Sequence, residues 1–353
     1  MGRPVPRPSS AAPAAPSADA ASADAAAWPD DGDDMPLQAS SATPAGDEIE
    51  TRHAVVDAGM HGRRLDHVLV ELAPEFSRSH LQGLIAAGHV RVAGVPAATA
   101  SRKLVLGQAI ELALVPTPES RAFRPEPMPL AIVHEDAHLL VVDKPAGLVV
   151  HPAAGNWSGT LLNGLLAHHA GAASLPRAGI VHRLDKDTSG LMVVAKSLVA
   201  MTALTRAIAA REVHRQYLAL CHGVLPAQPF SIDAPIARDP VSRVRMAVVP
   251  GGRAARTDVQ CLGAGQGISA ARCTLHTGRT HQIRVHLASR GHPLIADALY
   301  GGRPALGLQR QALHAQRLAF VHPVSGQALD LRSPLPDDLR RAAEQGFGAD
   351  FAP

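Results

Sequence analysis

The chain has 353 residues, enough for two or three compact domains, and 46% of them are hydrophobic, which excludes a wholly disordered protein. Its formal net charge is only +3. The three cysteines lack CxxC spacing, which argues against a disulfide scaffold or a structural zinc site and favours the cytoplasm. No apolar stretch approaches the length of about 18 residues that predicts a membrane helix, and the N-terminus lacks the pattern of a secretion signal.

The charge is distributed unevenly along the chain. The first fifty residues carry nine acids against two bases, a net charge of −7, so the remaining 303 residues carry +10. The same fifty residues include 14 Ala and 8 Pro, a composition that buries too little apolar surface to offset its ordering entropy. We therefore predict a disordered Ala/Pro/Asp-rich tail over residues 1–55, followed by a basic body suited to a polyanionic partner.

Residues 62–115 form a small unit with a pattern of its own. Apolar residues recur at helical spacing over 65–72, and Ser77 is placed to cap a second helix. Short alternating runs at 90–92 and 110–112 predict strands. Six basic residues decorate the unit: Arg63, Arg64, Arg78, Arg91, Arg102 and Lys103. Two helices on a small sheet, with this density of bases, indicate a phosphate-binding module.

Residues 116–129 contain five prolines and are predicted to form a semi-rigid linker. From 130 to 340, short β-rich runs lie between longer helical patterns, which predicts a mixed domain of helices and strands. Strands are expected at 139–142, 147–150, 180–181, 191–195 and 217–220, and helices at 160–169 and 199–210.

Three segments of this larger domain carry the chemistry. In 179–196, apolar strand-like runs flank the polar stretch HRLDKDTS, so a sheet would hold a charged loop firmly. In 277–287, TGRTHQIRVHL places four potentially cationic side chains within eight residues beside a glycine turn, which suits a phosphate or a carboxylate. In 211–217, a basic run ends at Tyr217, one of only two tyrosines and a candidate for stacking on a base.

These segments carry a family resemblance. HRLDKDTSGL, the upstream DKPAGLVVHPAAGN and TGRTHQIRVHL are similar to the three signature blocks of the RluA family of pseudouridine synthases. RLDHVL, SRSHLQGLI and GHVRVAG resemble the S4 RNA-binding domain that many of these enzymes carry. GGRP at 301–304 and QALHA at 311–315 resemble the members that act on large-subunit (23S) ribosomal RNA.

The resemblance implies an α+β fold: a small S4-type RNA-binding domain at 62–115 and a catalytic domain at 130–340. The catalytic domain would have a mixed, mainly antiparallel β-sheet with a central cleft. Asp185 matches the family's catalytic aspartate, Tyr217 its active-site tyrosine and Arg284 the basic residue paired with that aspartate, while Ile283 would line the apolar side of the pocket. Side chains expected to contact RNA are Arg183, Arg64, Arg78, Lys103, Arg279 and His281.

The implied reaction is the isomerisation of uridine to pseudouridine in RNA. It breaks the N1–C1′ bond, rotates the uracil and rejoins it through C5, so it needs neither a metal nor an organic cofactor. A carboxylate can add covalently or abstract the 2′-proton to give a glycal, and both routes require Asp185 to be ionised. The expected partner is ribosomal RNA or the pre-ribosomal large subunit, with neither a membrane nor a protein partner implied.

Other interpretations stay open. Transfer RNA or another ribosomal site would serve the same chemistry, and a non-catalytic S4-type assembly factor would share the basic body. Asp185 and Asp187 as a glycosidase pair are disfavoured because residues two apart in a tight loop point in different directions. The 19 histidines show no metal-ligand spacing such as HExxH. Ala93 stands where S4 domains commonly have Asn, so we expect a turn of another type at 93–94.

Overall fold

The computed structural model describes residues 49–115, 122–153, 155–242 and 244–351. These residues fall into two compact units, and the boundary between them in the sequence lies between Ser197 and Leu198. Most of the predicted tail, residues 1–48, lies outside the described residues, as do residues 116–121 of the predicted linker.

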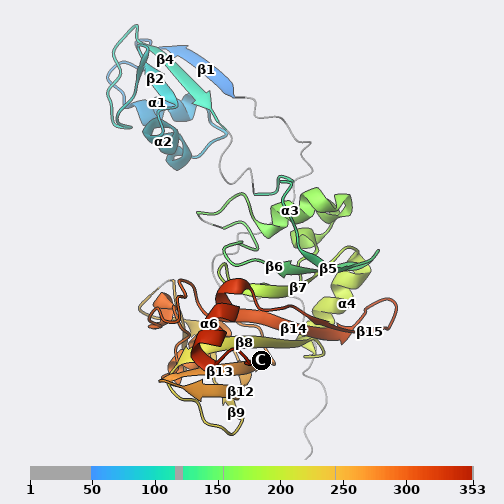
Figure 1. The fold of residues 1–353 in the computed structure, drawn as a ribbon. Helices are drawn as coiled ribbons and strands as arrows, with labels where there is room; N and C mark the ends of the chain where they lie inside the picture. Colours follow the sequence, from blue (N-terminus) through green and yellow to red (C-terminus); the bar gives the residue numbers. More distant parts are fainter. Residues whose placement is uncertain (1–48, 116–121, 154, 243, 352–353) are drawn as a thin grey trace, which may run out of the picture. The chain divides into compact units, whose positions relative to one another are not determined.

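The N-terminal part of the first unit is a small sheet with two helices along it (Figure 1). Its strands are β1 (Glu50–Val55), β2 (Val90–Val92), β3 (Val95–Pro96) and β4 (Ala109–Leu114), and its helices are α1 (Leu65–Leu72) and α2 (Arg78–Ala86). The strands pair antiparallel in the order β1-β4-β2-β3. Leu65, Leu69, Leu81, Ile110 and Leu112 are buried in one apolar core, so this part of the chain has a core of its own.

The sequence pattern predicts both helices correctly. α1 spans the expected 65–72, and α2 begins directly after Ser77, whose hydroxyl accepts a hydrogen bond from the His80 amide at 3.3 Å. Such a cap satisfies one of the amides that a helix N-terminus leaves without a partner.

Two expectations for this region are wrong. The tail was expected to reach residue 55, but residues 50–55 form β1, which pairs with β4 from Glu50↔Leu114 to Val55↔Ala109. At the 93–94 turn, both central residues have positive φ, 54° at Ala93 and 74° at Gly94, as in the primed hairpin turns that usually take Asn-Gly. Ala93 therefore adopts the left-handed conformation instead of changing the turn type.

The rest of the first unit contains the antiparallel strands β5 (Ile132–Glu135), β6 (Leu139–Lys144) and β7 (Ser189–Ala195). It also contains α3 (Leu161–His168) and the short 3₁₀ helices η2 (Ala170–Ser174) and η3 (Pro176–Gly179). α3 begins at a capping box between Thr160 and Asn163.

The described end of the predicted linker is bound to this helix. The Asn163 side-chain amide donates to the Ala122 and Arg124 carbonyls at 3.2 and 2.9 Å, and the Glu126 amide donates to the Asn163 carbonyl at 3.0 Å. A linker extending to residue 129 is therefore wrong for residues 122–126, which belong to the folded unit.

The second unit is a sheet of six antiparallel strands in the order β15-β14-β8-β13-β12-β9. They are β8 (His214–His222), β9 (Phe230–Asp233), β12 (Arg256–Gly265), β13 (Ile268–Leu275), β14 (Leu313–Val321) and β15 (Ala328–Arg332). The hairpin β10 (Ile236–Arg238)/β11 (Met246–Val248), the helices α4 (Leu198–Ala209), α5 (Gln282–Ser289) and α6 (Asp337–Phe347), and the 3₁₀ helix η4 (Ala298–Tyr300) complete it. α6 packs its Leu339 and Ala342 on Leu220 and Ala270 of the sheet (Figure 1).

Most elements expected between 130 and 340 are confirmed, but the strands at 147–150 and 180–181 are wrong. The carbonyls of Val149 and Val150 accept the Leu161 and Leu162 amides of α3, at 2.8 and 3.1 Å. That apolar run thus pairs with a helix N-terminus instead of a strand. Ile180 makes only an isolated bridge to Val194.

Candidate functional site

The most informative loop of the sequence ends in a turn that begins at Asp185. The Thr188 amide donates to the Asp185 carbonyl at 3.1 Å, and β7 starts at the next residue, Ser189. Asp185 is half-buried, whereas every residue of β7 is buried. The turn therefore presents a carboxylate at the edge of a rigid strand, where a catalytic group can be held in place.

A buried lysine holds the backbone of this turn. Lys144, at the end of β6, is 1% exposed, and its ammonium donates to the carbonyls of Pro145, Leu148 and Lys186 at 2.9 Å each. The Lys186 carbonyl also accepts the Gly147 amide at 2.9 Å. Since Lys186 directly follows Asp185, the DKPAG block and the HRLD block are fastened together at the residue beside the carboxylate.

Two histidines of the signature blocks are buried or partly buried: His182, three residues before Asp185, and His151 of the DKPAG block. The His182 Nε2 accepts the Val193 amide at 3.0 Å, which ties the HRLD loop to β7. Burial, followed by the positive charges of Arg183 and Arg177, lowers the pKa of His151 to about 3. His151 is therefore neutral at pH 7. Arg183, two residues before Asp185, has an exposed side chain.

In the second unit, an arginine of α5 is held by a buried ion pair. The Arg284 guanidinium donates from Nε and Nη2 to the two oxygens of Asp297, at 2.8 and 2.9 Å, and the two side chains are 7% and 1% exposed. A bidentate pair of this kind fixes the plane of the guanidinium as well as its position. The neighbouring Ile283 is 3% exposed.

Tyr300 connects this arginine to the TGRTH loop. The Arg284 guanidinium lies over the Tyr300 ring, 5.0 Å from its centroid. The Tyr300 hydroxyl accepts the Met246 amide at 3.0 Å and lies 2.7 Å from the Nδ1 of His281. His281 has φ 55° and directly precedes α5, so this contact holds a left-handed residue at the helix start.

Several contacts of the TGRTH loop (277–281) pass through Gln282, the first residue of α5. The Gln282 side-chain oxygen accepts the Thr277 hydroxyl at 2.7 Å and the Arg279 amide at 3.0 Å, while its nitrogen donates to the Arg256 carbonyl at 3.0 Å. The Arg279 Nε donates to the Ala254 carbonyl at 3.2 Å. The loop is therefore a preformed structure that the Gln282 amide holds together.

Tyr217 occupies the middle of β8 and is 5% exposed. It pairs across the sheet with Cys273 of β13 and Ala315 of β14, two small neighbours. Its burial among strands on both sides makes it a rigid aromatic side chain, as a stacking platform requires.

The S4-like part of the first unit gathers its own basic cluster around Asp66. This carboxylate is fully buried and accepts hydrogen bonds from Arg64 at 3.1 Å, Arg78 at 2.8 Å and Gln82 at 2.8 Å. These donors hold its pKa well below the usual range, despite burial. The side chains of Arg64 and Arg78 are 44% and 48% exposed. The backbone of Lys103 forms an isolated antiparallel β-bridge with that of Arg64.

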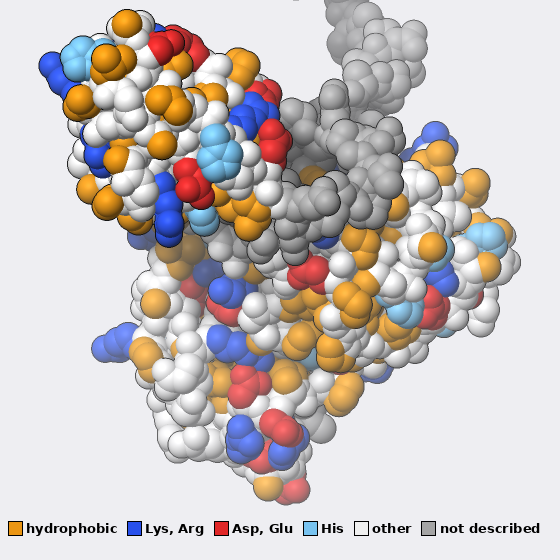
Figure 2. Space-filling view, turned by 90° about the horizontal axis from the view of Figure 1, so that it is seen from above, with side chains coloured by type: hydrophobic (Ala, Val, Ile, Leu, Met, Phe, Trp, Pro, Cys, Tyr) orange, Lys and Arg blue, Asp and Glu red, His pale blue; other side chains and the backbone are white. Residues whose placement is uncertain are grey.

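Surface charge elsewhere is mixed. In Figure 2, blue Lys and Arg side chains lie beside red Asp and Glu side chains on the visible face. Several form ion pairs, such as Arg63 with Glu71 and Arg340 with Glu344. The Asp66 cluster differs because its acid is buried and its arginines are exposed, so the surface of the cluster is basic.

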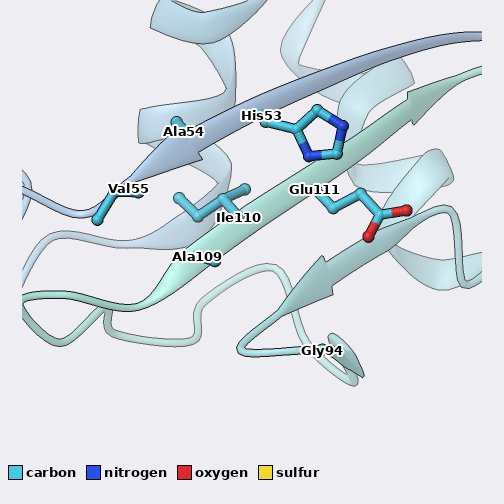
Figure 3. A pocket seen from close by; sticks show the side chains of 7 residues that line it. All are labelled: His53, Ala54, Val55, Gly94, Ala109, Ile110 and Glu111. Atoms are coloured by element: carbon cyan, nitrogen blue, oxygen red, sulfur yellow. The ribbon is translucent and has the colours of Figure 1, made fainter.

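A hollow of about 270 Å³ lies against β1 and β4. His53, Ala54, Val55, Gly94, Ala109, Ile110 and Glu111 line it (Figure 3). His53 and Glu111 face each other across the two strands. The hollow contains none of the residues of the signature blocks, and its lining is mainly small and apolar.

Among the residues that the structure describes, no group of three or more His, Cys, Asp or Glu side chains is arranged to hold a metal ion. Within the same residues, no helix has both the length and the apolar character needed to cross a bilayer. Burial raises the pKa of the Cys221 thiol to about 12, and that of Cys273 further still, so neither is a thiolate nucleophile at pH 7.

The residues predicted from the sequence therefore fall into three groups. One loop of the first unit contains Asp185 and Arg183. The S4-like part of that unit contains Arg64, Arg78 and Lys103. The second unit contains the other five: Tyr217, Arg279, His281, Ile283 and Arg284. Four residues that organise these groups are not among those predicted from the sequence: Asp66, Lys144, Asp297 and Tyr300. Two signals were available, since Asp66 interrupts an apolar helix face and Tyr300 is the only other tyrosine.

Two family models match the chain. A family model described as RNA pseudouridylate synthase matches residues 138–289, and the S4 domain model matches residues 63–110. The chain is 47% identical over 308 residues to the ribosomal large subunit pseudouridine synthase D of Nitrosomonas europaea, covering 85% of this chain and 89% of that protein. It is 48% identical over 306 residues to the protein of that name from Neisseria meningitidis serogroup B, covering 83% and 81%. The solved structure of human RNA pseudouridylate synthase domain containing 1 is 28% identical, covers 60% of this chain and 86% of its own, and has a TM-score of 0.47.

Proposed function

The chain belongs to the family of RNA pseudouridine synthases, and we propose that it converts uridine to pseudouridine in large-subunit (23S) ribosomal RNA, with Asp185 as the catalytic carboxylate. The choice of large-subunit ribosomal RNA as substrate is supported by the relatives named ribosomal large subunit pseudouridine synthase D, which match more than four fifths of the chain. The single observation that carries the catalytic assignment is the half-buried Asp185 on a turn that Lys144 and His182 hold to two strands.

The reaction defines what the carboxylate must do. The N1–C1′ bond of the uridine breaks, the uracil rotates, a C5–C1′ bond forms, and the proton leaves C5 while N1 gains one. No atom enters or leaves overall, so the proposal includes no cofactor. Asp185 acts either by adding to the nucleotide or by taking the 2′-proton, and an ionised carboxylate serves both routes.

The second unit supplies the proposed supporting groups. Tyr217 is proposed to stack on the uracil after it leaves the helix, which offsets part of the few kcal/mol that unstacking costs. Arg284 is proposed to act electrostatically on the carboxylate, and Ile283 to line the apolar wall. Their support comes from the family resemblance, from the burial of all three side chains and from the fixed plane of the Arg284 guanidinium.

Phosphate contacts are assigned to basic side chains that are exposed or half-buried. Arg64, Arg78 and Lys103 would bind the RNA backbone through the S4 domain, and Arg183 and Arg279, with His281, would bind it near the target nucleotide. Contacts to phosphates position the protein on the RNA but discriminate little between nucleotide sequences. The proposed partner is ribosomal RNA or the assembling large subunit in the cytoplasm, without a membrane or a protein partner.

The experiment compares the wild type with Asp185→Asn on an unmodified large-subunit ribosomal RNA transcript. Pseudouridines are mapped by carbodiimide labelling and primer-extension stops. We expect stops with the wild type and none with Asp185→Asn, while Asp187→Asn, the same change two residues later, should retain stops. Stops with Asp185→Asn would refute the catalytic assignment. Stops only on transfer RNA would refute the substrate while leaving the chemistry in place.

A further inference from the structure

Arg215, near the start of β8, is a buried cation that the proposed mechanism does not use. Its side chain is 5% exposed, and its Nε has no hydrogen-bond partner among the described residues. Burial lowers the pKa of its guanidinium, and among the described residues only Tyr217 acts in the opposite direction. Within the described part of the chain, no Asp or Glu forms an ion pair with it, in contrast to the pair between Arg284 and Asp297.

An arginine in this state is unusual because removing a charge from water is costly unless an opposite charge replaces the lost hydration. A bound anion would supply the missing charge. Arginine in particular presents a planar fork of donors that matches a phosphate or a carboxylate.

The position of the side chain indicates which ligand this is. Arg215 and Tyr217 are two residues apart on β8, so their side chains lie on the same face of the sheet. Arg215 also pairs across the sheet with Leu275, the last residue of β13, two residues before the TGRTH loop begins at Thr277. The guanidinium thus lies between the proposed base-stacking tyrosine and a loop that carries Arg279 and His281.

Gly278 of that loop leaves the guanidinium within reach of the surface. Gly278 is exposed, and a Cβ placed on it would lie 2.8 Å from the Arg215 Nη1. Its φ is not in the left-handed region, so backbone conformation does not require a glycine there. The close approach of the Arg215 guanidinium therefore explains why residue 278 is a glycine. Only the backbone of this exposed residue covers the arginine there.

We propose that Arg215, beneath Gly278, is a binding site for a backbone phosphate of the substrate RNA, next to the nucleotide that stacks on Tyr217. This inference rests on the proposed function for the identity of the RNA, and on the geometry of Arg215 for the anion. The phosphate would provide the charge that the protein itself does not place beside the guanidinium.

The test measures RNA affinity as a function of salt for the full-length protein. Arg215→Met removes the charge and keeps the length of the side chain. We expect it to weaken binding of the large-subunit transcript about tenfold at 0.1 M salt, and to reduce the slope of log K against log salt by about 0.7–0.9, the value for one phosphate contact. Its Tm should equal or exceed that of the wild type, because an uncompensated buried charge has been removed.

A second variant reaches the same site without changing the arginine. Gly278→Ala should displace the guanidinium and weaken RNA binding, with the fold intact, since residue 278 is exposed. Gly265→Ala is the matched control, because a Cβ there meets no atom within 4 Å and its φ is ordinary. Arg215→Lys keeps the charge and should retain the salt slope of the wild type.

Unchanged affinity and salt slope in Arg215→Met would overturn the proposal and leave Arg215 a structural residue. If Arg215→Met does not fold, unchanged binding by Gly278→Ala has the same consequence. Because binding is measured separately from modification, failure here is distinguishable from failure of the proposed function, which would appear as an absence of primer-extension stops with the wild type. Transfer RNA in place of the ribosomal transcript tests the same phosphate contact if that RNA proves to be the substrate.

Discussion

Replacement of Asp297 by Asn should destabilise the second unit far more than an ordinary loss of one charge. Asp297 is 1% exposed and forms two charged hydrogen bonds with Arg284, at 2.8 and 2.9 Å. An asparagine of the same shape offers one oxygen and turns an NH₂ group toward the guanidinium. The variant thus leaves a buried positive charge without compensation.

The expected cost follows from that burial. Breaking one partner of a buried ion pair typically costs about 3–5 kcal/mol. For a unit of this size, each kcal/mol lowers the Tm by about 2–4 °C, so we expect a decrease of roughly 6–20 °C. Catalytic rate at saturating RNA should also fall, because the plane of the Arg284 guanidinium is no longer fixed.

Differential scanning calorimetry of the full-length protein provides the assay, with hydrogen exchange of α5 as a local readout. The chain offers a matched control in Asp330, which also forms two hydrogen bonds of 2.7 Å with one arginine, Arg317, but is 48% exposed. Asp330→Asn should cost less than about 1 kcal/mol, as exposed pairs do. The double variant Asp297→Asn with Arg284→Met should recover stability without recovering activity.

A decrease in Tm of less than about 2 °C for Asp297→Asn would refute this reasoning, since the pair would then contribute no more than a surface pair. Equal effects of Asp297→Asn and Asp330→Asn would do the same. Either result would mean that burial of the Arg284 pair does not govern its energetics.

Two further variants address the first unit. Asp66→Asn should lower the free energy of unfolding of the S4 domain by about 1–3 kcal/mol at pH 7, measured by hydrogen exchange of α1 and α2. The pKa of Asp66 is depressed in the folded state, so this difference should be fully present above about pH 5 and shrink as the pH falls below about 4; a difference that grows with acid would contradict it. Lys144→Met should cost about 2 kcal/mol or more and speed exchange of the Gly147 amide, because three carbonyls lose their ammonium donor. RNA affinity should stay unchanged while the single-turnover rate falls, and an unaltered rate would show that Lys144 does not position Asp185.

Local pattern was sufficient for much of this protein. The helices α1 to α4 could be predicted because helical periodicity and caps such as Ser77 and Thr160 are encoded within a few residues. The signature blocks and the segment 211–217 are also short, so Asp185, Tyr217 and Arg284 could be nominated from the chain alone. Spacing along the chain carries this information because each block is confined to about a dozen residues.

The remaining features depend on partners that are distant in the sequence. β1 is a strand because β4, more than fifty residues later, pairs with it, and 147–150 is not a strand because the start of α3 takes its carbonyls. The ion pair of Arg284 with Asp297 and the approach of Gly278 to Arg215 join residues 13 and 63 positions apart. Hydrogen bonds, burial and close approach are properties of positions in space, so only the tertiary structure decided which charges are paired, which are buried, and where a glycine is needed.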